Sequence, residues 1–71
     1  MTYTSTVIIS KEGKWFVARS VELGVTTQGR TLEEAKKNLR EAMGLYLEDM
    51  PRSKKYLTKE SSFVTSIEVR G

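Results

Sequence analysis

"LGVTTQGRTLEEA", residues 23–35, contains the change of pattern that decides the fold. Residues 25–28 are rich in β-branched side chains, which favours a short strand, and a glycine stands on either side. We expect Gly24 and Gly29 to be turn residues that can take positive φ. At Thr31 the period of the sequence changes from 2 to about 3.6 residues. The stretch therefore predicts a strand, a corner and the start of a helix.

The predicted helix begins with the spacing of a capping box, Thr31 followed by Glu34. The Thr31 hydroxyl is expected to accept a hydrogen bond from the backbone N–H of Glu34, and the Glu34 carboxylate to accept one from the N–H of Thr31. Pro51 is expected to end the helix. Between them, apolar residues recur at spacings of three and four and form a stripe that we expect to face a sheet: Leu32, Ala35, Leu39, Ala42, Met43 and Tyr46.

The second half of the helix is apolar over a wider arc than one packed face needs, because Leu45, Leu47 and Met50 lie partly off the stripe. Gly44 costs about 1 kcal/mol relative to Ala in a helix interior. Close approach of another backbone would explain it, and that backbone can belong to the sheet or to a second subunit. We therefore expect self-association at Gly44, Leu47 and Met50, or through the last strand.

Two further strands precede the opening stretch. Residues 3–10 are rich in Thr, Val and Ile, Gly13 suits the turn of a hairpin, and residues 15–20 form the second strand. Alternation places Trp15, Val17 and Arg19 on one face of this strand and Phe16, Ala18 and Ser20 on the other. The run is too short to decide which face is buried, although Trp15 itself is expected to be buried.

Residues 61–70 are expected to close the fold as a fourth strand. One face of it would carry Phe63, Thr65, Ile67 and Val69, and the other Val64, Ser66, Glu68 and Arg70. The sequence therefore predicts one domain, residues 1–71, of the α+β class: a β-β-β-α-β two-layer sandwich with one helix packed on a four-strand, mostly antiparallel sheet.

Composition narrows the range of functions. The 71 residues contain neither cysteine nor histidine, which excludes zinc sites built on these residues, thiol chemistry and the commonest general base. No nucleophile and base pair has a convincing spacing, and Ser53 with Lys54 is expected to lie in a solvated loop. We predict that the protein is not an enzyme and has no catalytic residues, metal site or cofactor.

Positive charge is concentrated after the helix. The net charge is +3, and residues 52–59 hold Arg52, Lys54, Lys55 and Lys59 without an acid. These cations could contact a nucleic acid, with Tyr56 as a stacking group. The simpler interpretation, which we prefer, is a solvated connection whose Tyr56 and Leu57 pack against the core.

No segment of the sequence predicts a membrane location. The stretch MTYTSTVIIS lacks the pattern of a signal peptide, and no run approaches the roughly 20 apolar residues that span a bilayer. We expect a cytoplasmic protein.

Residues 22–49, "ELGVTTQGRTLEEAKKNLREAMGLYLED", resemble the HicB-like antitoxins of bacterial and archaeal toxin-antitoxin systems. The resemblance extends over roughly residues 3–50, and the combination of its pieces is fairly specific. The matching residues are Leu23, Gly24, Thr27, Gln28, Gly29, Thr31, Glu33, Glu34, Ala35, Asn38, Glu41, Ala42 and the stretch LYLE at residues 45–48.

The resemblance implies a partial ribonuclease-H-like fold and a function by binding. Such domains pair with a small HicA-like toxin of double-stranded-RNA-binding-domain fold, which cleaves messenger RNA, and they cover its active surface. Homodimers or higher homo-oligomers are also implied. The sequence departs from the family at Val21, where a Pro is common, and it ends without the C-terminal DNA-binding segment of many members, so direct DNA binding is unsupported.

We therefore predict an antitoxin-like protein that contacts its toxin through Glu22, Thr27, Gln28 and Arg30. The alternative is a solitary nucleic-acid-binding or regulatory module that uses the basic stretch.

Overall fold

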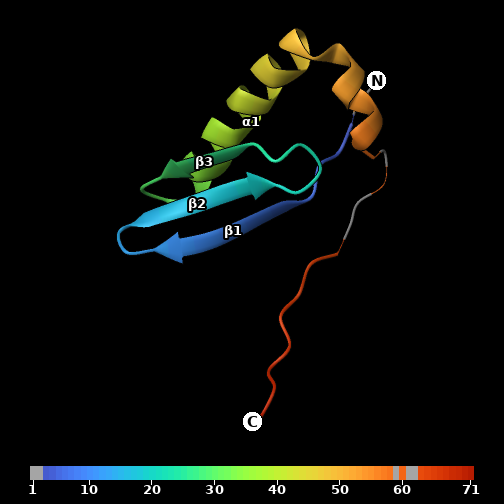
Figure 1. Cartoon of the computed structure of the whole chain (residues 1–71). Helices are drawn as coiled ribbons and strands as arrows, with labels where there is room; N and C mark the ends of the chain where they lie inside the picture. Colours follow the sequence, from blue (N-terminus) through green and yellow to red (C-terminus); the bar gives the residue numbers. More distant parts are fainter. Residues whose placement is uncertain (1–2, 59, 61–62) are drawn as a thin grey trace.

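A computed structural model of the chain describes residues 3–58, 60 and 63–71. Within these residues the fold is a three-stranded antiparallel sheet with one α-helix on one face (Figure 1). The elements are β1 (Val7–Glu12), β2 (Trp15–Ser20), β3 (Thr26–Gly29), α1 (Leu32–Asp49) and the 3₁₀ helix η1 (Pro51–Tyr56). The α+β class and the order of three strands before the helix are confirmed.

β1 and β2 form a hairpin with a shorter turn than the sequence predicted. Only Gly13 and Lys14 separate the strands, with φ +63° at Gly13, so Glu12 pairs with Trp15 and β1 continues beyond residue 10. The predicted start at residue 3 was wrong for the same strand, because Thr4 instead forms an isolated bridge with Thr58.

The face of β2 that carries Ala18 and Ser20 lies under α1, and both residues are fully buried. The opposite face of the sheet has no second layer among the described residues, so Trp15 remains 40% exposed. The expectation that Trp15 is buried was wrong, because one helix covers only one face of the sheet.

The hydrophobic core is small and centred on the stripe of α1. The described residues hold three buried apolar side chains, Ala18, Ala35 and Leu39. Half-buried side chains surround them: Val7, Ile9, Phe16, Val25 and Met43. The helical stripe is confirmed at its centre, whereas Leu32 at the first turn is 40% exposed.

The N-terminus of α1 has the predicted cap with one shift. The backbone N–H of Glu34 donates to the Thr31 hydroxyl at 3.0 Å. The Glu34 carboxylate accepts from the N–H of Arg30 at 3.2 Å, one residue before the predicted partner. The cap therefore also fixes the last residue of the corner.

The two glycines of the opening stretch have different roles. Gly24 takes φ +72°, as predicted for a turn residue. Gly29 does not take positive φ; instead, a Cβ on it would lie 2.5 Å from the backbone nitrogen of Ala35. The turn prediction for Gly29 was wrong, because this glycine is needed for the close approach of β3 and α1.

The chain beyond α1 differs from the prediction in two places. The connection after Pro51 was expected to be a solvated loop that includes Ser53 and Lys54, but Pro51–Tyr56 form η1 and Ser53 is buried. Residues 63–71 pair with no strand in the described part of the chain, and residues 61–62 of the predicted fourth strand lie outside it. The fourth strand and the partial ribonuclease-H-like fold are therefore not shown. Alternation describes side chains only, whereas a strand also needs a hydrogen-bonded neighbour, and residues 63–71 run away from β1 (Figure 1).

Candidate protein-binding surfaces

The loop between β2 and β3 is held by a directed chain of hydrogen bonds. The N–H of Leu23 donates to Ser20 Oγ at 3.2 Å, and Ser20 Oγ lies 2.7 Å from Ser5 Oγ. Ser5 Oγ and the N–H of Thr6 donate to one carboxylate oxygen of Glu22 at 2.7 and 2.8 Å. Because a carboxylate only accepts and Ser5 has one hydroxyl proton, Ser20 must donate to Ser5.

These hydrogen bonds lower the pKa of Glu22. Desolvation by partial burial raises the pKa of the Glu22 carboxyl, but the hydrogen bonds from Ser5 and Thr6 more than offset it, so the pKa lies below its ordinary value of 4.5. The carboxylate predicted as a partner contact therefore ties the loop to the residues just before β1.

Of the other three residues predicted to contact the partner, one side chain bonds within the fold and two are exposed. Thr27 Oγ1 donates to the carbonyl of Ala35 at 3.1 Å, so its side chain joins β3 to α1. The Gln28 carbonyl accepts from Asn38 Nδ2 at 2.9 Å, while the Gln28 side chain is exposed. Arg30 is also exposed, with its guanidinium 5.7 Å from the ring centroid of Trp15. Contact of these residues with a partner stays a prediction.

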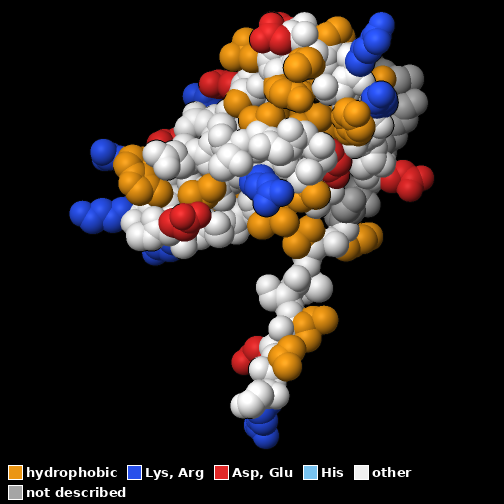
Figure 2. All heavy atoms as spheres, viewed as in Figure 1, with side chains coloured by type: hydrophobic (Ala, Val, Ile, Leu, Met, Phe, Trp, Pro, Cys, Tyr) orange, Lys and Arg blue, Asp and Glu red, His pale blue; other side chains and the backbone are white. Residues whose placement is uncertain are grey.

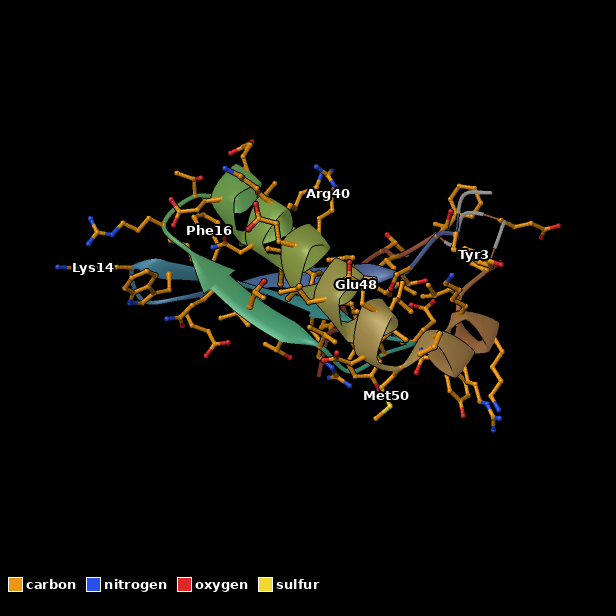
Figure 3. The ribbon with its side chains drawn as sticks, turned by 90° about the horizontal axis from the view of Figure 1, so that it is seen from above. Tyr3, Lys14, Phe16, Arg40, Glu48 and Met50 are labelled. Atoms are coloured by element: carbon orange, nitrogen blue, oxygen red, sulfur yellow. The ribbon has the colours of Figure 1, made fainter. Side chains whose placement is uncertain are left out.

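The face of the sheet opposite α1 is the first candidate surface, and we call it the open sheet face. Ile8 and Trp15 are 46% and 40% exposed there. A hollow of about 260 Å³ lies at one end of it, lined by Lys14, Trp15 and Arg30. Lys14 stands at the hairpin end of the sheet, far from Tyr3 and Met50 (Figure 3). By strand register the open sheet face consists of Ile8, Ser10, Glu12, Trp15, Val17, Arg19, Thr26 and Gln28.

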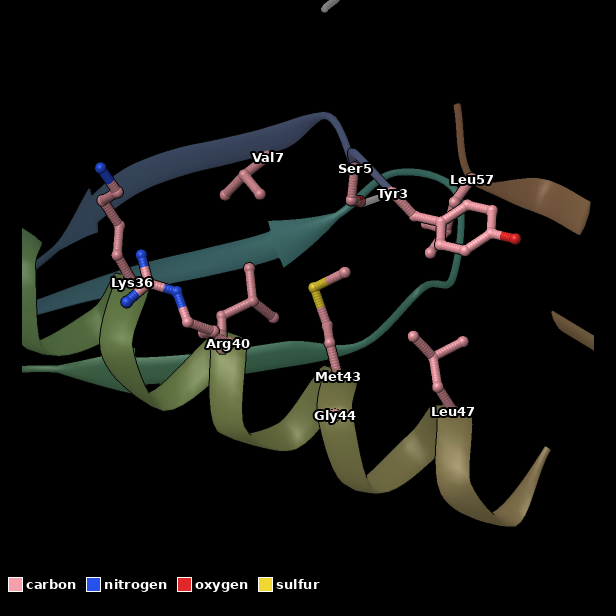
Figure 4. A pocket seen from close by; sticks show the side chains of 10 residues that line it. Tyr3, Ser5, Val7, Lys36, Arg40, Met43, Gly44, Leu47 and Leu57 are labelled. Atoms are coloured by element: carbon pink, nitrogen blue, oxygen red, sulfur yellow. The ribbon is translucent and has the colours of Figure 1, made fainter. Parts of the chain in front are cut away.

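The second candidate surface is a hollow between β1 and α1, which we call the β1–α1 groove. Its volume is about 370 Å³ and its lining is mainly apolar, with Lys36 and Arg40 near one end and Tyr3 and Leu57 near the other (Figure 4). The remaining lining residues are Ser5, Val7, Leu39, Met43, Gly44 and Leu47. Two of the residues predicted for self-association, Gly44 and Leu47, therefore meet in this groove. Met50 does not line it and is 54% exposed beyond the helix end.

The basic stretch is the third candidate surface. Arg52, Lys54 and Lys55 are exposed on η1, and Lys59 lies outside the described residues. Tyr56 is 58% exposed, with Lys55 Nζ 5.3 Å from its ring centroid, so the prediction that it packs against the core was wrong. Leu57 does pack inward, at the end of the β1–α1 groove.

The described residues include neither a cluster of acidic side chains suited to a metal ion nor a helix that could span a membrane. In the part of the chain that the structure describes, no three Asp or Glu residues come together as a group able to hold a metal ion. Across the same residues, no helix combines the length and the apolar character needed to cross a bilayer.

Sequence reasoning missed the β1–α1 groove and the Ser5–Ser20 contact. Alternation offered a signal for both, because Ser5 and Val7 share one face of the first strand. That signal becomes usable only once the register between β1 and β2 is known, since Val7 pairs with Ser20.

Comparison with known proteins gives the family of the chain. The UPF0150 protein of Helicobacter pylori strain J99 is 34% identical over 64 residues, which are 89% of each chain. No solved structure matches. A family model with the description "Family of unknown function (DUF7387)" matches residues 3–61. The match covers more than half of the sequence, so the chain belongs to the DUF7387 family.

Proposed function

We propose that this protein is a cytoplasmic antitoxin-like binding protein that neutralises a small messenger-RNA-cleaving toxin by covering its active surface. The similarity to the UPF0150 protein supports this, because UPF0150 is the HicB-like family that residues 22–49 resemble. On this proposal the protein acts by binding and not by catalysis.

The exposure of Trp15 on the open sheet face is the observation that carries the proposal. Trp is enriched among the residues that dominate binding energies at protein interfaces. Trp15 is 40% exposed, Ile8 on the same face is 46% exposed, and Arg30 lies against the indole ring. Ile8 and Trp15 lie at opposite ends of this face, with Ser10 and Val17 between them, so Trp15 is the proposed anchor of the contact.

The residues that carry the resemblance support the fold and leave partner choice to other positions. Thr27, Gly29, Thr31 and Asn38 all fix the corner between β3 and α1 through the hydrogen bonds and the close approach described above. Such residues serve the fold whichever toxin is bound. We propose that Trp15, with the outward side chains of Gln28 and Arg30, selects the partner.

Co-expression with the product of a small adjacent gene tests the proposal. We expect that product alone to stop growth and degrade messenger RNA, and this protein to restore growth and to copurify with it. Trp15→Ala should weaken the complex by at least about 30-fold, the equivalent of a 2 kcal/mol hot spot. Lys37→Ala, an exposed position on α1, is the matched control and should bind normally. If no neighbouring small protein binds and no toxicity is relieved, the proposal fails.

One observation favours a second candidate, binding to single-stranded nucleic acid through η1. Tyr56 is exposed among Arg52, Lys54 and Lys55, which is the combination of stacking and charge that such binding uses. This candidate predicts that affinity for a labelled single-stranded RNA falls steeply with salt, and that Tyr56→Ala weakens it. The absence of a mobility shift at low salt would eliminate it.

A further inference from the structure

The C-terminal segment, residues 63–71, is extended and exposes nearly all of its apolar surface. Phe63 is 99% exposed, Ile67 83% and Val69 86%. The segment, which we call the arm, stands clear of the sheet and helix, and hydrophobic side chains follow it (Figures 1 and 2). Apolar side chains arranged this way along an extended chain suit a surface that another part of a protein covers.

The arm has the pattern of a strand with one apolar face. Its alternation places Phe63, Thr65, Ile67 and Val69 on one side. An extended segment of this kind can add to a free sheet edge, where backbone hydrogen bonds hold it and alternate side chains enter an apolar hollow.

The β1–α1 groove offers such an edge and such a hollow. α1 packs against β3 and β2 and leaves the β1 side of the sheet uncovered. Among the described residues, the strand β1 pairs with no strand but β2, so its outer edge has free N–H and C=O groups. Val7 on β1 and Met43 and Leu47 on α1 point into the hollow between the two elements (Figure 4).

We propose that the arm of one copy lies in the β1–α1 groove of a second copy, and that two copies exchange arms in a symmetric dimer. The arm of each chain projects away from its own β1 and α1 (Figure 1), whereas exchange covers both arms and both grooves through one two-fold interface. Gly44 fits this arrangement, because a Cβ on it would meet nothing within 4 Å and the groove is open there. The exchange involves this chain alone and is independent of any toxin.

The mass of the purified full chain and of three variants in solution tests the proposal. Each chain is 8.1 kDa, and we expect the wild type to have the mass of two chains. Ile67→Asn on the apolar face of the arm and Gly44→Leu in the groove should each weaken the dimer at least about tenfold. Val64→Asn, on the other face of the arm, is the matched control and should remain dimeric. A monomeric wild type, or a dimer that both Ile67→Asn and Gly44→Leu leave intact, would overturn the exchange.

Cross-linking separates exchange from an arm that folds back on its own groove. The chain has no cysteine, so a variant with Met43→Cys and Ile67→Cys carries only the two introduced thiols. With a short bis-maleimide we expect a covalent dimer on a denaturing gel. An internally linked single chain would place the arm in its own groove, and no linked product would place it elsewhere; either result contradicts exchange.

Discussion

At the scale of single residues, the polar and small side chains of the corner and the loop are fixed by contacts with distant parts of the chain. Position 29 requires a glycine, because the backbone of α1 occupies the space that a Cβ would need. The position of the Glu22 side chain is fixed by hydrogen bonds, because Ser5 and Thr6 both donate to its carboxylate. Both residues therefore affect stability, and each effect can be measured.

Gly29→Ala is expected to lower the free energy of unfolding by about 1–3 kcal/mol, because β3 and α1 must separate to admit the methyl group. Chemical denaturation followed by circular dichroism measures the change. Gln28→Ala is the control, since that side chain is exposed on the neighbouring position, and its effect should stay within about 0.5 kcal/mol. Equal stability of the two variants would contradict the close approach.

Glu22 is expected to make stability depend on pH in the acid range. Its folded-state pKa is lowered, so its stabilising contribution is complete above the ordinary value of 4.5 and is lost as the pH falls through the folded-state pKa. Glu22→Gln should cost about 1 kcal/mol at neutral pH, because a neutral amide accepts more weakly than a carboxylate.

Denaturation curves of the wild type and Glu22→Gln between about pH 6 and pH 3 measure this dependence, and the variant should lose less stability on acidification. Ser5→Ala, which removes one of the donors, should give an intermediate dependence. If Glu22→Gln shows the same acid loss as the wild type, the carboxylate is not held as described.

At the scale of elements, α1 is stabilised at its start by a local cap and along its length by the sheet. Thr31 caps the N–H of Glu34, and the apolar stripe buries Ala35 and Leu39 against β2 and β3. η1 then reverses the chain so that Leu57 returns to the groove. The cap is local, so its contribution can be tested without changing the packing.

Thr31→Ala is expected to lower the free energy of unfolding by about 1 kcal/mol, because the N–H of Glu34 loses its acceptor. Thermal unfolding followed by the helical circular dichroism signal measures it. Thr31→Asp keeps an acceptor at the N-cap and should retain nearly all of the stability. A loss as large for Asp as for Ala would mean that the cap contributes little.

At the scale of the whole molecule, the chain has more apolar surface than its own core covers. The described residues bury three apolar side chains completely, whereas the arm and the open sheet face expose several large ones. A domain of this size is near the lower limit at which one core suffices. Association with a second copy would therefore add stability as well as cover the arm.

The unfolding temperature of the wild type is expected to rise with protein concentration, because arm exchange binds the folded state. Differential scanning calorimetry over a wide range of concentrations measures this shift. Ile67→Asn should remain folded, since the side chain is exposed, but its unfolding temperature should begin to rise only at higher concentrations than that of the wild type. A wild-type unfolding temperature that is constant over the range would argue against exchange.

The local features of this protein follow from short stretches of its amino-acid sequence. The sequence predicted the capped helix that begins after Thr31 and ends before Pro51, the three strands before it, and the turn glycines at 13 and 24. Each of these depends on interactions between residues close together in the chain: a side chain capping a nearby N–H, the ring of a proline, or a glycine in a two-residue turn. It also placed Gly44 and Leu47 on a common surface, because they are three residues apart on one helix.

Contacts between distant parts of the chain set which faces of the sheet are covered and which polar groups are hydrogen-bonded within the fold. The tertiary structure placed Ala18 under α1, left Trp15 exposed, brought the backbone of α1 against Gly29, and gave the carboxylate of Glu22 hydrogen bonds from Ser5 and Thr6. The same alternation of side chains that predicted β2 also occurs in the arm, yet of the two only β2 pairs with other strands within the described residues. Periodicity gives the side chains that share a face, whereas burial and pairing depend on the element that lies opposite, and that is set by contacts between residues far apart in the sequence.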